Sequence, residues 1–163
     1  MNLDLLAQYE IPYLHPLAVH FPLVLLLLGA GVAVLYAALG RPVWRHAALA
    51  FFALGAVGAY VAQETGETLA HAVEGEPVVE AVLETHETMG DYTLWTALAT
   101  AVGFGGITVA LRRRAPADPV PAAAPREPLA WRLAVLVPAV AAALLVAYTG
   151  HLGGVMVWGV PAG

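Results

Sequence analysis

Six histidines and no cysteine define the chemistry that this chain of 163 residues could support. Without cysteine the chain cannot form disulfides, zinc–thiolate sites, cysteine-bound iron–sulfur clusters or the covalent haem attachment of a CxxCH motif. Histidine is the commonest metal ligand that remains, and two neutral imidazoles can bind a haem iron from its two sides. We therefore expect any redox cofactor to be held by histidine, with methionine and carboxylates as the other available ligands.

The composition predicts that the elements carrying these histidines lie in a membrane. Hydrophobic residues make up 60% of the chain and charged residues 12%, whereas a soluble domain of this size needs a more polar surface. Helices are expected, because a bilayer offers no partner for unpaired backbone groups and a helical span needs about 17–25 residues. The fold class is thus predicted to be all-α, an integral membrane four-helix bundle in which residues 1–163 form a single domain. The expected spans cover residues 16–39, 43–63, 92–111 and 130–149.

The basic residues predict the orientation in the membrane. All seven are arginines, and they fall within two stretches, residues 41–45 and 112–132. Short loops rich in basic residues stay in the cytoplasm, so the loop after the first span and the loop after the third span are expected inside. Both termini and the central loop are then outside. We expect a multi-pass protein of the bacterial inner (cytoplasmic) membrane that contacts the lipid bilayer and binds no nucleic acid, because the arginines serve as topology anchors.

The segments beside the spans are predicted from proline, glycine and charge. Residues 115–128 contain five prolines and are expected to be a cytoplasmic linker without chemistry of its own. The break at Gly75-Glu76-Pro77 predicts an extracytoplasmic helical hairpin between spans 2 and 3, and ten of the twelve acidic residues fall on that side. Pro22 predicts a kink in the first turns of span 1. The apolar segment after Gly154 is expected to leave the fourth helix and return along the outer surface.

This topology gathers five of the six histidines at the outer face, and every helix contributes at least one. At about 100° per residue, His15 and His20 diverge by roughly 140° around a helix, so they would serve different sites. His46 lies on the inner side beside Arg45 and is expected to be an interfacial residue. The five outer histidines are His15, His20, His71, His86 and His151.

Histidines on facing helices of a bundle are suited to haem b, since the helices also supply an apolar slot. The candidate cofactor ligands are His15, His20, His86 and His151, with His71 in reserve. Of these, His20 and His86 are the leading candidates for the haem iron. Nearby carboxylates could orient the imidazoles or carry protons, and the candidates are Glu64, Glu67 and Glu87.

Other cofactors and roles are less well supported by the residues. Copper is a competing possibility, because Met89 follows His86 by three residues on the same helical face. A di-iron centre of the bundle type needs Glu-x-x-His pairs, which are absent. Apart from His20 near one edge, the apolar segments hold no ionisable residue other than tyrosine. This argues against a pump or an ion-coupled transporter, which would normally carry charges at mid-membrane depth.

Three motifs carry a resemblance to a known family. They are His15-Pro16-x-x-Val19-His20-Phe21-Pro22, His86-Glu87-x-x-Gly90 and Thr149-Gly150-His151-x-Gly153-Gly154-x-x-Val157-x-Gly159. Together they resemble a bacterial family of four-helix integral membrane proteins of unknown function, over nearly the whole chain. Some members occur with cytochrome c domains or respiratory genes, which implies a redox setting. The family often has tyrosine where this chain has Trp158, so no role is carried over to that position.

Two functional hypotheses follow from these observations. The first is a membrane-bound b-type cytochrome-like electron-transfer subunit, with a histidine-ligated haem near the periplasmic face and a periplasmic cytochrome c or a quinone as its reaction partner. The alternative is a non-catalytic accessory subunit of a larger respiratory or photosynthetic membrane complex, in which the histidines are structural. Neither hypothesis assigns catalytic residues, and both differ from a stand-alone enzyme. A visible spectrum of the purified protein would distinguish the two.

Overall fold

The computed structural model describes residues 14–72, 77–114 and 126–159, and within these ranges it contains only helices and their connections. The predicted all-α class is therefore confirmed. Four of the helical segments are long and apolar enough to cross a membrane. The helices are α2 (His15–Ala18), α3 (His20–Leu39), α4 (Pro42–Ala72), α5 (Pro77–Arg114) and α6 (Leu129–Trp158).

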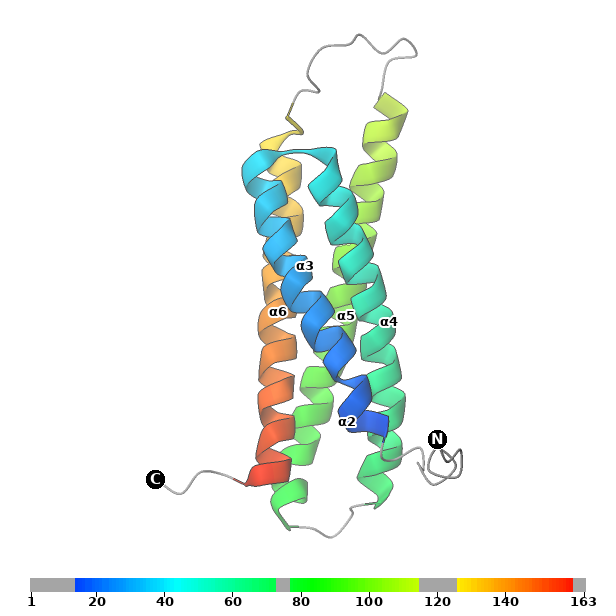
Figure 1. Ribbon diagram of the computed structural model, residues 1–163, viewed down its shortest axis with the longest axis vertical. Coiled ribbons are helices and arrows are strands. Elements are labelled where there is room, and N and C mark those ends of the chain that lie inside the picture. The colour runs from blue at the N-terminus through cyan, green and yellow to red at the C-terminus, as the bar shows by residue number, and fades with distance from the viewer. Residues whose placement is uncertain (1–13, 73–76, 115–125, 160–163) are drawn as a thin grey trace, which may run out of the picture.

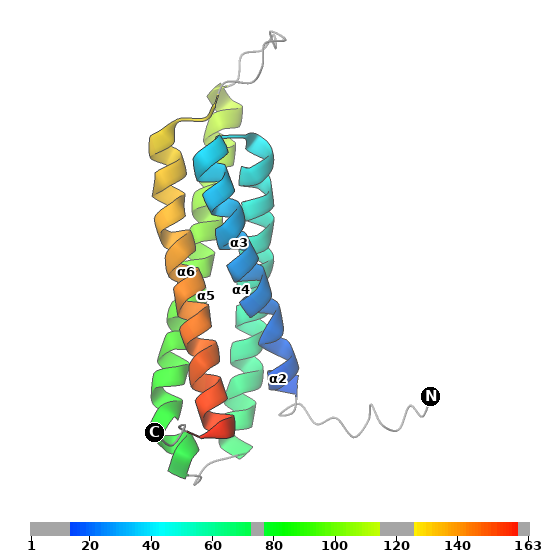
Figure 2. The same ribbon diagram turned by 60° about the vertical axis from the view of Figure 1, so that its left-hand side comes forward.

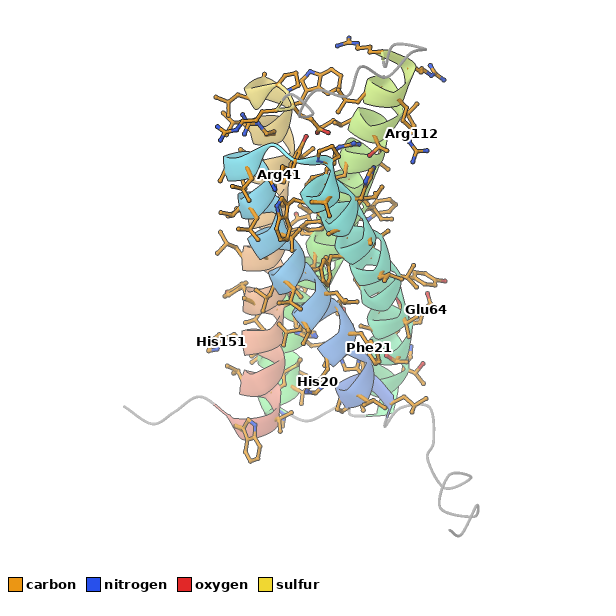
Figure 3. All side chains as sticks on the ribbon, turned by 45° about the horizontal axis from the view of Figure 1, so that its top comes forward. His20, Phe21, Arg41, Glu64, Arg112 and His151 are labelled. Atoms are coloured by element: carbon orange, nitrogen blue, oxygen red, sulfur yellow. The ribbon has the colours of Figure 1, made fainter. Side chains whose placement is uncertain are left out.

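The four long helices lie side by side along the long axis of the molecule and alternate in direction (Figures 1 and 2). Helix α3 packs against α4 and α6, and α5 packs against the same two helices. Arg41 and Arg112 lie at one end of the bundle, whereas His20, His151 and Glu64 lie toward the other (Figure 3). We call these the arginine end and the histidine end. The charge sorting seen in the sequence thus becomes a separation along the bundle axis.

Proline and glycine set the ends of the helices. Pro42 begins α4 and Pro77 begins α5, where the missing N–H of proline costs no helical hydrogen bond. Gly40 ends α3 with a φ of 63°, a left-handed conformation that glycine adopts without a Cβ penalty. Pro22 cannot donate to the Ala18 carbonyl, and the helix is interrupted between Ala18 and His20. The kink expected near Pro22 is therefore present.

The helices on either side of the central break extend well beyond a membrane span, as expected. Helix α4 has 31 residues and α5 has 38, which correspond to lengths of about 46 Å and 57 Å at 1.5 Å per residue. The hydrocarbon core of a bilayer is only about 30 Å thick. The helical hairpin between spans 2 and 3 is thus confirmed, and it lies at the histidine end.

The end of α6 differs from expectation. The helix continues through Gly150, Gly153 and Gly154 to Trp158, so the segment after Gly154 does not return along the surface as predicted. Each glycine lowers helix stability by about 1 kcal/mol relative to alanine; of the three, Gly153 is the one that lies against α5. A Cβ at Gly153 would lie 3.4 Å from Cε1 of His86. The glycines predict a helix end, but Gly153 instead allows a close approach between α6 and α5.

The bundle core is built from three aromatic rings surrounded by small residues. Phe52 stacks on Phe104 with ring centroids 6.0 Å apart, and Tyr36 lies 5.9 Å from Phe104. The alanines around these rings are Ala33, Ala48, Ala56, Ala97, Ala139 and Ala142. Large apolar side chains face outward instead; Val102 is 73% exposed and Val137 72%. This distribution suits helices whose outer surface contacts lipid.

The crossing of α3 and α4 depends on Gly55, and its substitution gives a test of the fold. A Cβ at Gly55 would lie 2.5 Å from Cδ2 of Leu26, which is fully buried. We expect Gly55→Ala to lower the free energy of unfolding by about 1–3 kcal/mol, the usual cost of overpacking a core. The measurement is thermal unfolding in detergent, followed by circular dichroism. Gly31→Ala is the matched control, because a Cβ there meets nothing within 4 Å; equal melting temperatures for the two variants would contradict this packing.

Candidate functional site

Two of the predicted histidines face each other at the histidine end. His15 begins α2 and His86 lies on α5, and their ring centroids are 6.3 Å apart with an angle of 82° between the ring planes. Both rings are partly buried. The two residues are 71 positions apart in the sequence, so the bundle itself brings them together. We refer to them as the histidine pair.

Hydrogen bonds to the backbone define the protonation of both rings. Nδ1 of His15 lies 2.9 Å from the carbonyl oxygen of Ala62, and Nδ1 of His86 lies 3.1 Å from that of Thr149. A carbonyl oxygen can only accept, so in both rings Nδ1 carries the hydrogen and donates it. In a neutral imidazole this leaves Nε2 with its lone pair. Metal-binding histidines commonly use the same device, an N–H donated to a carbonyl that fixes the ring and leaves the other nitrogen as the ligand.

The two histidines occupy equivalent positions in the two halves of the bundle. His15 bonds to the carbonyl of Ala62 and packs against Gly66, four residues later; a Cβ at Gly66 would lie 2.9 Å from Cε1 of the ring. His86 bonds to the carbonyl of Thr149 and faces Gly153, again four residues later. In each half the first helix supplies the imidazole, and the second supplies the carbonyl and the glycine. The two imidazoles therefore have equivalent surroundings and lie next to each other.

A second set of hydrogen bonds fastens the helices next to the histidine pair. Thr65 lies 3.2 Å from Nδ1 of His15 and donates its own hydroxyl to backbone carbonyls of α4. Thr93 and Thr149 share a hydrogen bond of 3.2 Å between α5 and α6. Gln63 donates to Asp91 at 2.9 Å, which links α4 to α5. These contacts join α2 to α4, α4 to α5 and α5 to α6 next to the two rings.

The other candidate ligands lie elsewhere on the surface. His20 is exposed and donates from Nδ1 to the carbonyl of Pro16 at 2.6 Å, within its own segment of chain. His151 is also exposed and points away from the bundle (Figure 3). His71 is exposed near the end of α4. The structure therefore brings His15 and His86 together, whereas His20, the other leading candidate for the haem iron, is exposed and bonds within its own segment. His15 and His20 thus have different surroundings, as their angular divergence around a helix predicts.

The carboxylates predicted to assist the imidazoles are on the outer surface of the hairpin. Glu64, Glu67 and Glu87 are all exposed. Their suggested role in orienting imidazoles or carrying protons remains a prediction. In the part of the chain that the structure describes, no group of three or more His, Asp or Glu side chains is arranged to hold a metal ion.

A buried charged cluster at the arginine end was missed by the sequence analysis. Glu127 is 8% exposed, accepts a hydrogen bond of 2.6 Å from the Tyr36 hydroxyl and pairs with Nε of Arg45 at 3.1 Å. Arg132 donates from Nη1 to the carbonyl of Ala37 at 2.6 Å. We call Tyr36, Arg45, Glu127 and Arg132 the arginine-end cluster.

This cluster corrects the interpretation of the inner linker. Residues 115–128 were expected to be a connector without chemistry of their own, but Glu127 joins the start of α6 to α3 and α4, and its N–H donates to the Gly40 carbonyl at 3.1 Å. Arg45 and Arg132 were interpreted as topology anchors, yet they are only 4% and 9% exposed. One signal was available: Glu127 is an acid among arginines, directly before an apolar span.

The comparison with known families agrees with this architecture. The family described as "Predicted membrane protein (DUF2231)" matches residues 11–163. The chain therefore belongs to this family of membrane proteins of unknown function, as the motifs indicated. No curated protein and no solved structure matches the chain.

Proposed function

We propose that this protein is a membrane-bound b-type cytochrome-like electron-transfer subunit, in which His15 and His86 would hold a haem iron. The observation that carries the proposal is the histidine pair, with its two Nδ1–H groups bonded to backbone carbonyls. Relative to the ligands favoured from the sequence, His15 replaces His20. A haem iron held there would accept and donate single electrons.

The spacing of the two rings supports a shared metal centre. Metal–nitrogen bonds are about 2 Å long, so two imidazoles on opposite sides of one metal have ring centres about 6 Å apart. The observed separation is 6.3 Å. The glycines behind the rings, Gly66 and Gly153, lie where a larger residue would press on the imidazoles.

The number of donors favours haem over a bare ion. A structural or catalytic zinc site uses three or four protein ligands, and the described residues contain no such group. A porphyrin supplies four nitrogens itself and requires only the two axial ligands. A bundle with apolar helices is also a common setting for such a cofactor.

The charge distribution supports a role on the periplasmic side. The positive-inside bias would place the arginine end in the cytoplasm and the histidine end outside. Exposed acids surround the histidine end and would attract a basic partner, such as a periplasmic cytochrome c; a quinone is the alternative reaction partner. These acids are Glu64, Glu67, Glu80, Glu84, Glu87 and Asp91.

The partner assignment predicts a salt-dependent rate of electron transfer. We expect the double variant Glu84→Gln/Glu87→Gln to reduce a basic cytochrome c several-fold more slowly than the wild type at low salt, because two steering charges are lost. At about 0.5 M salt the difference should largely disappear through screening. Stopped-flow absorbance measures both rates. Removal of one charge at the opposite end, in Arg113→Gln, is the control; an unchanged rate in the double variant would contradict the acidic docking surface.

The visible spectrum of the purified protein tests the cofactor directly. The protein is expressed in cells that make haem, purified in mild detergent and measured reduced minus oxidised. We expect the sharp bands of haem b at about one haem per chain. A folded, colourless preparation would contradict the proposal and would favour the accessory subunit with structural histidines.

A further inference from the structure

The arginine-end cluster carries more positive charge than its single buried carboxylate can neutralise. Arg45 and Arg132 contribute two guanidinium groups. Among the described residues Glu127 pairs with Arg45, whereas Arg132 donates to the Ala37 carbonyl and has no acid as a partner. A net positive charge that is nine-tenths buried is costly unless an anion accompanies it.

The cluster also has too few hydrogen-bond acceptors for its two arginines. Nη1 of Arg45 and Nε of Arg132 are buried and have no hydrogen-bond partner in the described part of the chain. Every nitrogen of a guanidinium is a donor, and none is an acceptor. An oxyanion would accept hydrogen bonds from these two donors and would also offset the excess positive charge. The guanidinium geometry matches carboxylate and phosphate oxygens best.

The position of the cluster indicates where the oxyanion comes from. Arg114 lies over the ring of Trp131 at 5.0 Å, and such aromatic and basic residues mark the membrane–water interface. The exposed Arg126 adjoins Arg132, since a Cβ at Gly40 would meet both side chains within about 3.2 Å. Phosphate groups of lipids lie at this depth, and basic pockets between spans bind anionic headgroups.

We propose that Arg45 and Arg132 bind a phosphate group, and that this phosphate belongs to the headgroup of an anionic phospholipid in the leaflet at the arginine end. Arg126 would stand at the rim of the site. Glu127 holds Arg45 in place and limits the excess charge to one. The site lies at the opposite end of the bundle from the histidine pair and does not depend on whether haem is bound.

The test uses the full-length protein, purified in mild detergent, with three additions compared at equal concentration. These are phosphatidylglycerol, phosphatidylcholine and inorganic phosphate. We expect phosphatidylglycerol alone to raise the melting temperature, and native mass spectrometry to show one retained phosphatidylglycerol per chain. Equal stabilisation by inorganic phosphate would overturn the lipid assignment, and no preference for phosphatidylglycerol over phosphatidylcholine would overturn the site. This wild-type comparison does not rely on any variant.

Two arginine variants with the same change in charge locate the site. Arg132→Gln should reduce the retention of phosphatidylglycerol at least tenfold. Arg113→Gln is the control, because Arg113 is exposed at the same end and its loss affects only the surface potential. Equal losses in the two variants would show that binding is a general surface effect and would overturn the proposal.

Discussion

Replacing either His15 or His86 by alanine is expected to reduce the haem bound per chain at least tenfold. Loss of a group that only orients a metal ligand already costs about 10–100-fold in affinity, and these substitutions remove a ligand itself. The two variants should behave alike, because the rings occupy equivalent positions in the two halves of the bundle. The measurement is the ratio of extracted haem to protein after purification, with circular dichroism to confirm that each variant remains helical.

The exposed histidines provide matched controls for this prediction. His20→Ala and His151→Ala remove an imidazole from the same end of the bundle, yet neither ring contacts the histidine pair, and both variants should retain haem. Gly66→Ala should weaken haem binding without removing a ligand, because its Cβ would lie 2.9 Å from Cε1 of His15. Loss of haem in His20→Ala with retention in His15→Ala would reverse the ligand assignment.

Replacing Glu127 by alanine is expected to lower the free energy of unfolding by about 3–5 kcal/mol, the usual cost of leaving a buried charge without its partner. The substitution removes the ion pair with Arg45 and the acceptor of the Tyr36 hydroxyl at once. Tyr36→Phe removes only one hydrogen bond and should cost less, about 1–3 kcal/mol. Thermal unfolding in detergent, followed by circular dichroism, ranks the stability of the wild type, Tyr36→Phe and Glu127→Ala.

An exposed carboxylate is the control for Glu127. Glu84 lies on the surface of α5, so Glu84→Ala should melt close to the wild type. If Glu127→Ala melted at the same temperature as Glu84→Ala, the arginine-end cluster would contribute nothing measurable to stability. Such a result would also weaken the phosphate-site proposal, which requires the cluster to hold its arginines in place.

The sequence was sufficient for the features that depend on local patterns. Apolar runs predicted four helices, the proline at position 22 predicted a kink, and the break predicted before Pro77 agrees with the start of α5 at that residue. These signals act within one or two helical turns, where backbone sterics and hydrogen bonding decide the outcome. The prediction for the end of α6 was wrong because it considered only the low helix propensity of glycine. Gly153 packs against His86 on a neighbouring helix, and this contact lies outside the local sequence.

The contacts between helices could be predicted only in part. The topology placed five histidines in one layer, but the rotation of each helix about its axis determines which ring meets which. That rotation is set by close packing, such as Gly55 on Leu26, and no local pattern reveals it. For the same reason the sequence predicts Arg45 only as a topology anchor and does not reveal that the bundle buries it against Glu127.

The central claim is that His15 and His86 share one iron, and electron paramagnetic resonance of the oxidised protein tests it most directly. A ferric haem with imidazole on both sides is low-spin, whereas loss of one axial imidazole favours a high-spin signal. We predict a low-spin signal for the wild type and for His20→Ala, and a high-spin signal for any haem retained by His15→Ala or His86→Ala. A low-spin signal of unchanged intensity in either of the last two variants would contradict the claim.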